Sequence, residues 1–264
     1  MLCQESLAKL PELRREIPRI LRDIPEIAQK RGFPSKNDCA ECQYSKLDFD
    51  SDLEFLVEFG RLRERCMRVV DCCLQCDWTQ PLTVCLEWLN LRVLARENLK
   101  LPQAEYEIMN RYLKTVLDPL SRRDEFATAL PELLALLDRL LIKMDNGTDM
   151  AELNLQLSTV SALFVCLPQH ADRTANVLRV ISKILRAESS ADPTEHSHIQ
   201  ATKRHALSDL LRLATEFPKA CEAHSQDIFA TAQSVFNSLS LMQQASLIQC
   251  LAVLSDRFEN PDQR

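Results

Sequence analysis

The chain has 264 residues, of which 32 are basic and 38 acidic, so its net charge of −6 lacks the overall basic character of a nucleic-acid-binding domain. Only three residues are glycine, too few for the turns of a β-sheet protein of this size. Apolar residues make up 46% of the sequence, but no run of about 18 of them occurs, which excludes a membrane-spanning segment. The first residues lack the basic and apolar regions of a signal peptide, so we expect none.

Amphipathic segments of helical period follow one another along the chain, joined by short polar breaks. We predict ten helices, over residues 7–28, 53–77, 81–98, 102–117, 125–144, 150–167, 171–186, 199–216, 226–239 and 241–258. Taken in antiparallel pairs, they repeat every 40 to 50 residues or so, as in HEAT and armadillo arrays. The pattern predicts an all-α fold, a right-handed α-solenoid of about five HEAT-like hairpins that occupies residues 1–264 as a single segment. A compact helical bundle is the alternative.

The segment from Gly32 to Asp52 differs from the rest of the chain. It is rich in turn-forming residues, has no 3.6-residue apolar period and carries four aspartates, at positions 38, 48, 50 and 52. We therefore predict a long, irregular acidic loop between helices over residues 32–52. Loops of this length inside compact domains are uncommon and usually functional.

The 11 cysteines include two Cys-x-x-Cys pairs, Cys39 with Cys42 and Cys73 with Cys76, which together would suit a four-thiolate zinc site. A long separation between the pairs, and the apolar helical surroundings of the second pair, favour reduced and mostly buried thiols instead. The sequence also lacks the glycine-rich phosphate loops and the nucleophile and metalloprotease motifs of common enzymes. We therefore expect no metal site, no cofactor, no catalytic residues and no enzymatic activity.

Six short stretches, in order along the chain, resemble the middle of the exportin-5 family of nuclear transport receptors, within the karyopherin-β superfamily. They lie at residues 17–22, 32–52, 86–89, 160–164, 204–206 and 247–260. The most distinctive is the segment over 32–52, with Gly32-Phe33-Pro34-Ser35-Lys36 near its start and Asp48-Phe49-Asp50-Ser51-Asp52 at its end. Members of the family are several times longer, so the resemblance implies that this chain is a central piece of a longer exportin.

The resemblance implies a nuclear export receptor that shuttles between nucleus and cytoplasm and meets nuclear pore proteins. It further implies binding of Ran-GTP and of double-stranded RNA with a 3′ overhang, the pre-microRNA type of cargo. By position in the family, the RNA-binding residues are Lys203 and Arg204, at the start of a helix, and Ser240 and Gln244, at a hairpin turn. Backbone amides and polar side chains at such places position phosphates.

Acidic loops of karyopherins commonly face the basic surface of Ran, so the resemblance implies a Ran-binding role for Asp48, Asp50 and Asp52. We expect Phe49 or Tyr44 to hold this loop against a helix. Two other interpretations stay open from the sequence: a generic helical-repeat scaffold that binds proteins, and a truncated product that is inactive on its own.

Overall fold

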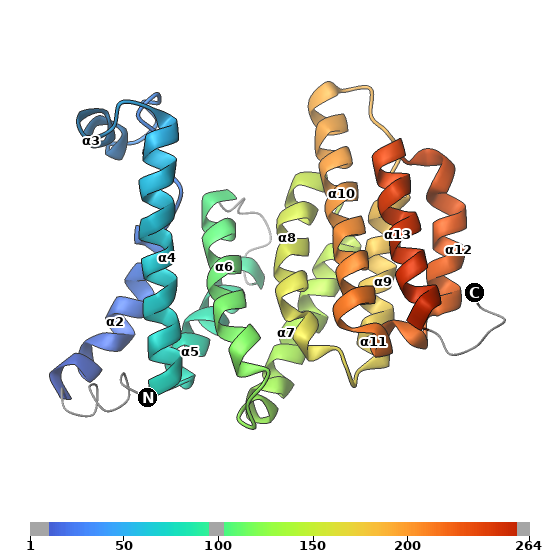
Figure 1. Ribbon diagram of the computed structural model, residues 1–264, viewed down its shortest axis with the longest axis horizontal. Coiled ribbons are helices and arrows are strands. Elements are labelled where there is room, and N and C mark those ends of the chain that lie inside the picture. The colour runs from blue at the N-terminus through green and yellow to red at the C-terminus, as the bar shows by residue number, and fades with distance from the viewer. Residues whose placement is uncertain (1–10, 95–102, 258–264) are drawn as a thin grey trace. The chain divides into compact units, whose positions relative to one another are not determined.

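The computed structural model describes residues 11–94 and 103–257, and in these ranges it contains helices and their connections but no strand (Figure 1). None of the helices in the described ranges combines the length and the apolar character that a membrane crossing requires. Contacts between residues divide the chain into two compact units, Met1–Arg123 and Asp124–Arg264. Each unit is described by itself.

The first unit contains two pairs of long helices and one short helix. Its elements are α2 (Pro11–Ile27), α3 (Glu41–Asp48), α4 (Asp52–Cys76), α5 (Thr79–Trp88), the π-helix η1 (Leu89–Leu94) and α6 (Gln103–Leu120). Helix α2 packs against α4 and α5, and both of these pack against α6. The short α3 lies near the start of α4, at the far end from α5 (Figure 1).

A buried carboxylate joins the second pair of the first unit. Glu105 on α6 accepts a hydrogen bond from Trp88 Nε1 at 3.0 Å and two from the Arg92 guanidinium, at 2.9 and 2.8 Å. Because a buried carboxylate is costly unless it is paired and hydrogen-bonded, this network fixes η1 and the end of α5 against α6. Trp88 also packs edge-on against Tyr106, with ring centroids 5.4 Å apart.

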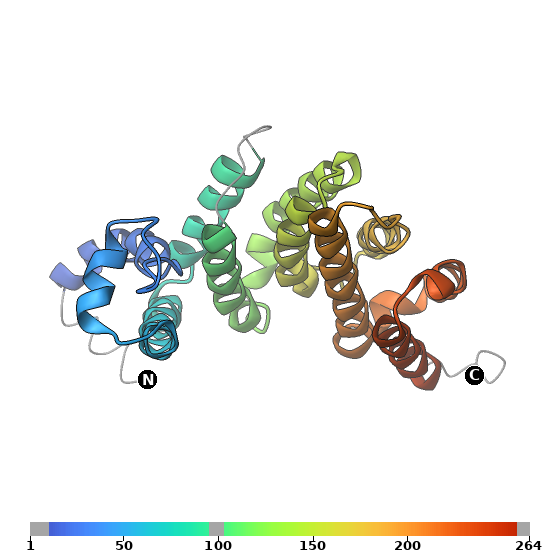
Figure 2. The ribbon, with the colours of Figure 1, turned by 90° about the horizontal axis from the view of Figure 1, so that it is seen from above.

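The second unit is built from three helical pairs in two layers. Its elements are α7 (Phe126–Asn146), α8 (Met150–Ala162), the 3₁₀-helix η2 (Leu163–Cys166), α9 (Ala171–Leu185), α10 (Pro193–Glu216), α11 (Pro218–Glu222), α12 (Ser225–Val235), the 3₁₀-helix η3 (Phe236–Ser238) and α13 (Leu241–Arg257). Helices α8, α10 and α13 pack side by side in one layer, and α7, α9 and α12 form the other (Figure 2). Short connections between successive pairs give this unit the arrangement of helical repeats.

The all-α, helical-repeat prediction is confirmed, and most predicted helices differ from the observed ones only near their ends. The largest shift is at α10, which we expected to begin at residue 199. It begins at Pro193 because Asp192 caps it, accepting the backbone N–H groups of Thr194 at 2.7 Å and Glu195 at 3.1 Å. Predicted segments within residues 7–10, 95–102 and 258 lie outside the described residues. That residues 1–264 form one continuous repeat segment stays a prediction.

The prediction of an irregular loop over residues 32–52 is wrong in its second half. Helix α3 occupies Glu41–Asp48, and Asp52 is already the first residue of α4. Helix α3 was invisible to the apolar pattern because it buries only Cys42 and Ser45 and exposes Tyr44 and Leu47. Contacts of the residues on either side of it, rather than an amphipathic stripe, position this short helix.

Candidate functional site

The segment before α4 is fastened to the first turns of that helix by Asp52. The carboxylate of Asp52 accepts the backbone N–H of Ser35 at 2.9 Å and the Ser35 hydroxyl at 2.6 Å. These hydrogen bonds from Ser35, the side-chain bond first, lower the pKa of Asp52 because they favour the charged carboxylate. Asp52, expected to face Ran, is therefore half-buried and occupied in closing the loop.

Contacts of Phe33 and Phe49 with a phenylalanine of α4 hold the same segment. The ring of Phe55, buried on α4, lies 5.4 Å from Phe33, 5.5 Å from Phe49 and 5.4 Å from Phe59, measured between centroids. Of the two aromatic residues expected to hold the loop, Phe49 makes such a contact, whereas Tyr44 is 70% exposed. Aromatic packing thus anchors the backbone on both sides of α3.

Asp48 and Asp50 are the two expected Ran-binding residues that reach the surface. Asp48 ends α3 and Asp50 follows two residues later, and both are exposed. Ser51 caps α4 by accepting the N–H of Glu54 at 3.2 Å, and the carboxylate of Glu54 accepts the N–H of Asp50 at 3.0 Å. Glu54 is engaged in this N-terminal cap and Asp52 in its hydrogen bonds from Ser35, so of the three aspartates expected to bind Ran, Asp48 and Asp50 present exposed charge.

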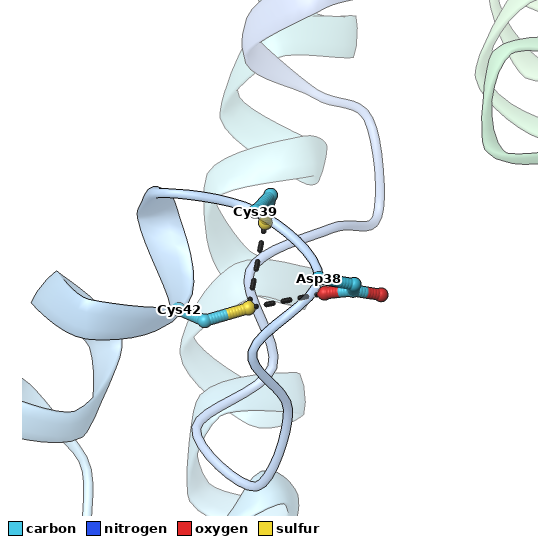
Figure 3. Close-up of side chains that lie close together, drawn as sticks. All are labelled: Asp38, Cys39 and Cys42. Carbon is cyan, nitrogen blue, oxygen red and sulfur yellow. Dashed lines mark hydrogen bonds between the residues drawn. The ribbon is translucent and has the colours of Figure 1, made fainter.

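A cluster of two thiols and a carboxylate lies at the start of α3 (Figure 3). The Sγ atoms of Cys39 and Cys42 are 3.4 Å apart, and the Cys42 thiol donates a hydrogen bond to Asp38 Oδ1 at 3.2 Å. Cys42 is buried, Cys39 is half-buried and Asp38 is exposed. None of the described cysteines is in a disulfide and most are buried, which agrees with the prediction of mostly buried thiols; their reduced state stays a prediction.

The residues that could join Cys39 and Cys42 in a metal site differ from those that the spacing suggested. Within the described ranges, the one group of three or more potential metal ligands is Asp38, Cys39 and Cys42, and the pair at Cys73 and Cys76 is not part of it. The signal for this cluster in the sequence was Asp38, which directly precedes the Cys-x-x-Cys pair. Spacing alone did not reveal that the backbone would turn the carboxylate toward the sulfur atoms.

In the second unit, the structure separates the two basic residues expected to bind RNA. Arg204 is exposed on α10, but Lys203 is only 2% exposed, and burial lowers its pKa. Lys203 lies on the same helical stripe as Ile199, Ala206 and Leu210, all buried. RNA binding by Lys203 stays a prediction, now with a buried side chain, and the apolar spacing around Lys203 was the signal of that burial in the sequence.

A bridge of glutamines places the start of α13 beside α10. Gln243 Nε2 donates to Gln200 Oε1 at 3.0 Å, while Gln243 Oε1 accepts the backbone N–H of Ser240 at 3.0 Å. Ser240 is exposed at the turn, and Arg204 lies one helical turn beyond Gln200. The structure thus brings Arg204 and Ser240 to neighbouring parts of adjacent helices.

The side chain of Gln244 has a different role. Its Nε2 atom donates to the carbonyl oxygens of Phe236 at 3.0 Å and Leu239 at 3.1 Å, so the amide group closes the turn before α13. Gln244 therefore holds the turn that carries Ser240.

Comparison with known proteins places these features in a family. A family model described as Exportin-5 matches residues 7–264. Exportin-5 of Mus musculus is 26% identical over 290 aligned residues, which cover 97% of this chain and 23% of the relative. Exportin-5 of Homo sapiens is 25% identical over 289, with the same coverage of each. This chain therefore spans 23% of the length of these two relatives. Because the family model covers nearly the whole sequence, the chain belongs to the Exportin-5 family.

Proposed function

We propose that this chain acts in nuclear export, as part of a receptor that shuttles between nucleus and cytoplasm. In this proposal it binds Ran-GTP, hairpin RNA with a 3′ overhang and nuclear pore proteins. The observation that carries the proposal is the family match over residues 7–264, together with relatives that are named exportins. The role is one of binding and transport rather than catalysis.

For Ran, the proposal assigns the contact to Asp48 and Asp50. Both carboxylates are exposed, and the segment that carries them is anchored on α4 by the contacts of Phe55 and Asp52. A fixed pair of negative charges raises the local potential and attracts a basic surface, and the attraction weakens with salt. Asp52 would serve to hold the segment rather than to touch Ran.

The variant Asp48→Asn/Asp50→Asn tests this contact. Exposed charge pairs contribute about 0.2 to 1 kcal/mol each, so the affinity for Ran-GTP should fall by about 2- to 30-fold and its salt dependence should flatten. The matched control is Asp124→Asn/Asp172→Asn, which removes two exposed carboxylates of the second unit. Equal affinity and salt slope for both variants and the unchanged chain would remove Asp48 and Asp50 from the Ran contact.

For RNA, the proposal assigns a phosphate contact to Arg204 and a polar contact to Ser240, on neighbouring helices. Lys203 would support the site by packing in the buried face of α10, and Gln244 by closing the turn that carries Ser240.

The variant Arg204→Ala tests the phosphate contact. It should lower the salt slope of binding to an overhang-bearing RNA hairpin by about 0.7 to 0.9 units, as expected for one lost phosphate contact. Lys219→Ala, a change of an exposed lysine on α11, is the matched control and should leave the slope unchanged. An unchanged slope in Arg204→Ala would refute the contact.

A protein-binding scaffold is the second candidate, and one cavity favours it. About 380 Å³ of space lies between α9, α12 and α13, with an apolar lining that includes Leu178, Ile228 and Leu247 and a charged rim that includes Arg179 and Asp227. Such a cavity suits an apolar side chain of a bound peptide. Leu178→Trp would fill this cavity with a larger side chain. If the unchanged chain binds neither RNA nor Ran-GTP but binds peptides, and Leu178→Trp abolishes peptide binding, the scaffold function replaces the export proposal.

A further inference from the structure

We propose that Asp38, Cys39 and Cys42 form a binding site for a thiophilic divalent cation, which in a cell is Zn²⁺. The site would fasten the start of α3 to the segment before it. The proposal rests on the side chains of the first unit alone, so it stands or falls independently of the proposed export function.

The distances between the three donor atoms suit one small cation. With Zn–S distances of about 2.3 Å and Zn–O distances of about 2.1 Å, tetrahedral geometry puts two sulfur donors about 3.8 Å apart and a sulfur and an oxygen donor about 3.6 Å apart. The two sulfur atoms are 3.4 Å apart, Cys42 Sγ is 3.2 Å from Asp38 Oδ1, and all three donors lie within 4.8 Å of one another. Increases of about 0.4 Å would bring the S–S distance and the Cys42–Asp38 distance to these values.

The chemistry of the donors selects the metal. Two thiolates favour zinc over magnesium or calcium, which prefer oxygen ligands. In the structure the Cys42 thiol donates its proton toward Asp38, the place where a cation would bridge sulfur and carboxylate. Binding the metal replaces the thiol protons, which go to solvent, and leaves three anionic ligands around a doubly positive ion.

An acidic residue, Glu41, lies between the two cysteines in the chain, as the first residue of α3, and forms an ion pair with Arg31 at 3.2 Å. Glu41 is not one of the donors that lie within 4.8 Å of one another, so a water molecule would complete the four ligands. Arg31 also reduces the repulsion among the acidic groups near the site.

The need for such a site follows from the weak anchoring of α3. This helix has eight residues and buries only Cys42 and Ser45, and its Leu47 is 85% exposed. Helices of this length are unstable without tertiary support. Cys42 is fully buried at the first turn, so a metal held there would supply the anchoring that apolar side chains supply to the longer helices.

The experiment uses the full 264-residue chain, stripped of metal with a chelator and kept reduced with a phosphine, and titrated with Co²⁺. We expect one Co²⁺ per chain, the absorption bands of tetrahedral cobalt with thiolate charge transfer, and displacement by one equivalent of Zn²⁺ but not by millimolar Mg²⁺. Cys39→Ser/Cys42→Ser should abolish the charge-transfer band. Asp38→Asn, a change at an exposed position, should weaken Co²⁺ binding at least tenfold.

The matched control is Cys72→Ser/Cys76→Ser, which removes two half-buried thiols of α4 and should leave the cobalt bands unchanged. Circular dichroism must show the same helix content in every variant, and the Asp38→Asn result keeps the test decisive if the double cysteine variant unfolds. Absence of the bands in the unchanged chain would overturn the proposal. Bands that persist without Cys39 and Cys42, or that depend on Cys72 and Cys76, would do the same.

Discussion

Asp209 is a buried acid in the second unit whose charge the structure only partly satisfies. The carboxylate, on α10, accepts the Ser161 hydroxyl at 2.8 Å through Oδ1, while Oδ2 has no hydrogen-bond partner and lies 3.6 Å from His205 Nε2. Burial raises the pKa of Asp209 to about 7, against the lowering effects of Ser161 and Arg212. The group is therefore protonated in the folded chain over a pH range in which the unfolded chain has lost the proton.

This shift gives a pH dependence of stability with a definite sign. Between about pH 4 and 7 the folded state binds more protons at Asp209 than the unfolded state, so its contribution to stability is lost as the pH rises. Burial lowers the pKa of His205, so just below pH 6.5 this group has the opposite effect and its contribution to stability increases as the pH rises. Asp209→Asn removes only the first effect, and from pH 5 to 8 the variant should gain about 2 to 4 kcal/mol relative to the unchanged chain. Urea denaturation at each pH measures this, with Asp172→Asn as the exposed control; parallel pH profiles would contradict it.

Two glycines should respond oppositely to the same substitution. Gly32 has φ +82°, and a Cβ there would lie 2.9 Å from Glu41 Cβ, whereas a Cβ at Gly60, inside α4, meets nothing within 4 Å. Gly32→Ala should destabilise the first unit by about 1 to 3 kcal/mol, and Gly60→Ala should stabilise it by about 0.5 to 1 kcal/mol. Thermal denaturation of the two variants measures this difference. Equal shifts of the midpoint would contradict the prediction, because they would show that alanine is accommodated at position 32 without strain.

At the scale of elements, Lys183 ties α9 to the end of α7. Its ammonium group donates to three carbonyl oxygens of that end, Met144 at 3.0 Å, Asp145 at 2.6 Å and Gly147 at 2.6 Å. The last carbonyl groups of a helix lack partners within the helix and carry partial negative charge, so a cation there satisfies both needs.

Removal of this cation should loosen the pair. Lys183→Met keeps most of the side-chain volume but removes three charge-assisted hydrogen bonds, so the free energy of unfolding of the second unit should fall by about 1 to 3 kcal/mol. Urea denaturation followed by circular dichroism measures the loss. Lys219→Met, at an exposed position, is the control, and an equal effect of both changes would deny Lys183 this role.

At the scale of the whole molecule, the two units should unfold as separate cooperative blocks. Contacts cluster within each unit, and the stability of a repeat protein comes from contacts between near neighbours along the chain. Both tryptophans, Trp78 and Trp88, lie in the first unit, so their fluorescence reports on that unit alone. We expect the fluorescence transition in urea to be unaffected by Lys183→Met while the circular dichroism transition shifts. Coincident shifts of both signals would show one cooperative unit.

The sequence by itself determined the helical class and most helix positions, because glycine poverty and 3.6-residue apolar periodicity are local properties that a helix expresses directly. The same periodicity, applied to Lys203, would have placed it on the buried stripe of Ile199 and Ala206. The resemblance of short segments identified the family, which the comparison of the whole chain confirmed.

Only the tertiary structure decided which polar groups meet. It formed α3 without an apolar pattern, turned Asp52 onto Ser35 and brought Asp38 against the thiols of Cys39 and Cys42. Side-chain directions in an irregular segment depend on backbone turns and on aromatic contacts such as those of Phe55, which join residues that no fixed spacing relates. Periodicity describes faces of regular helices, so it cannot reveal a cluster that irregular backbone assembles.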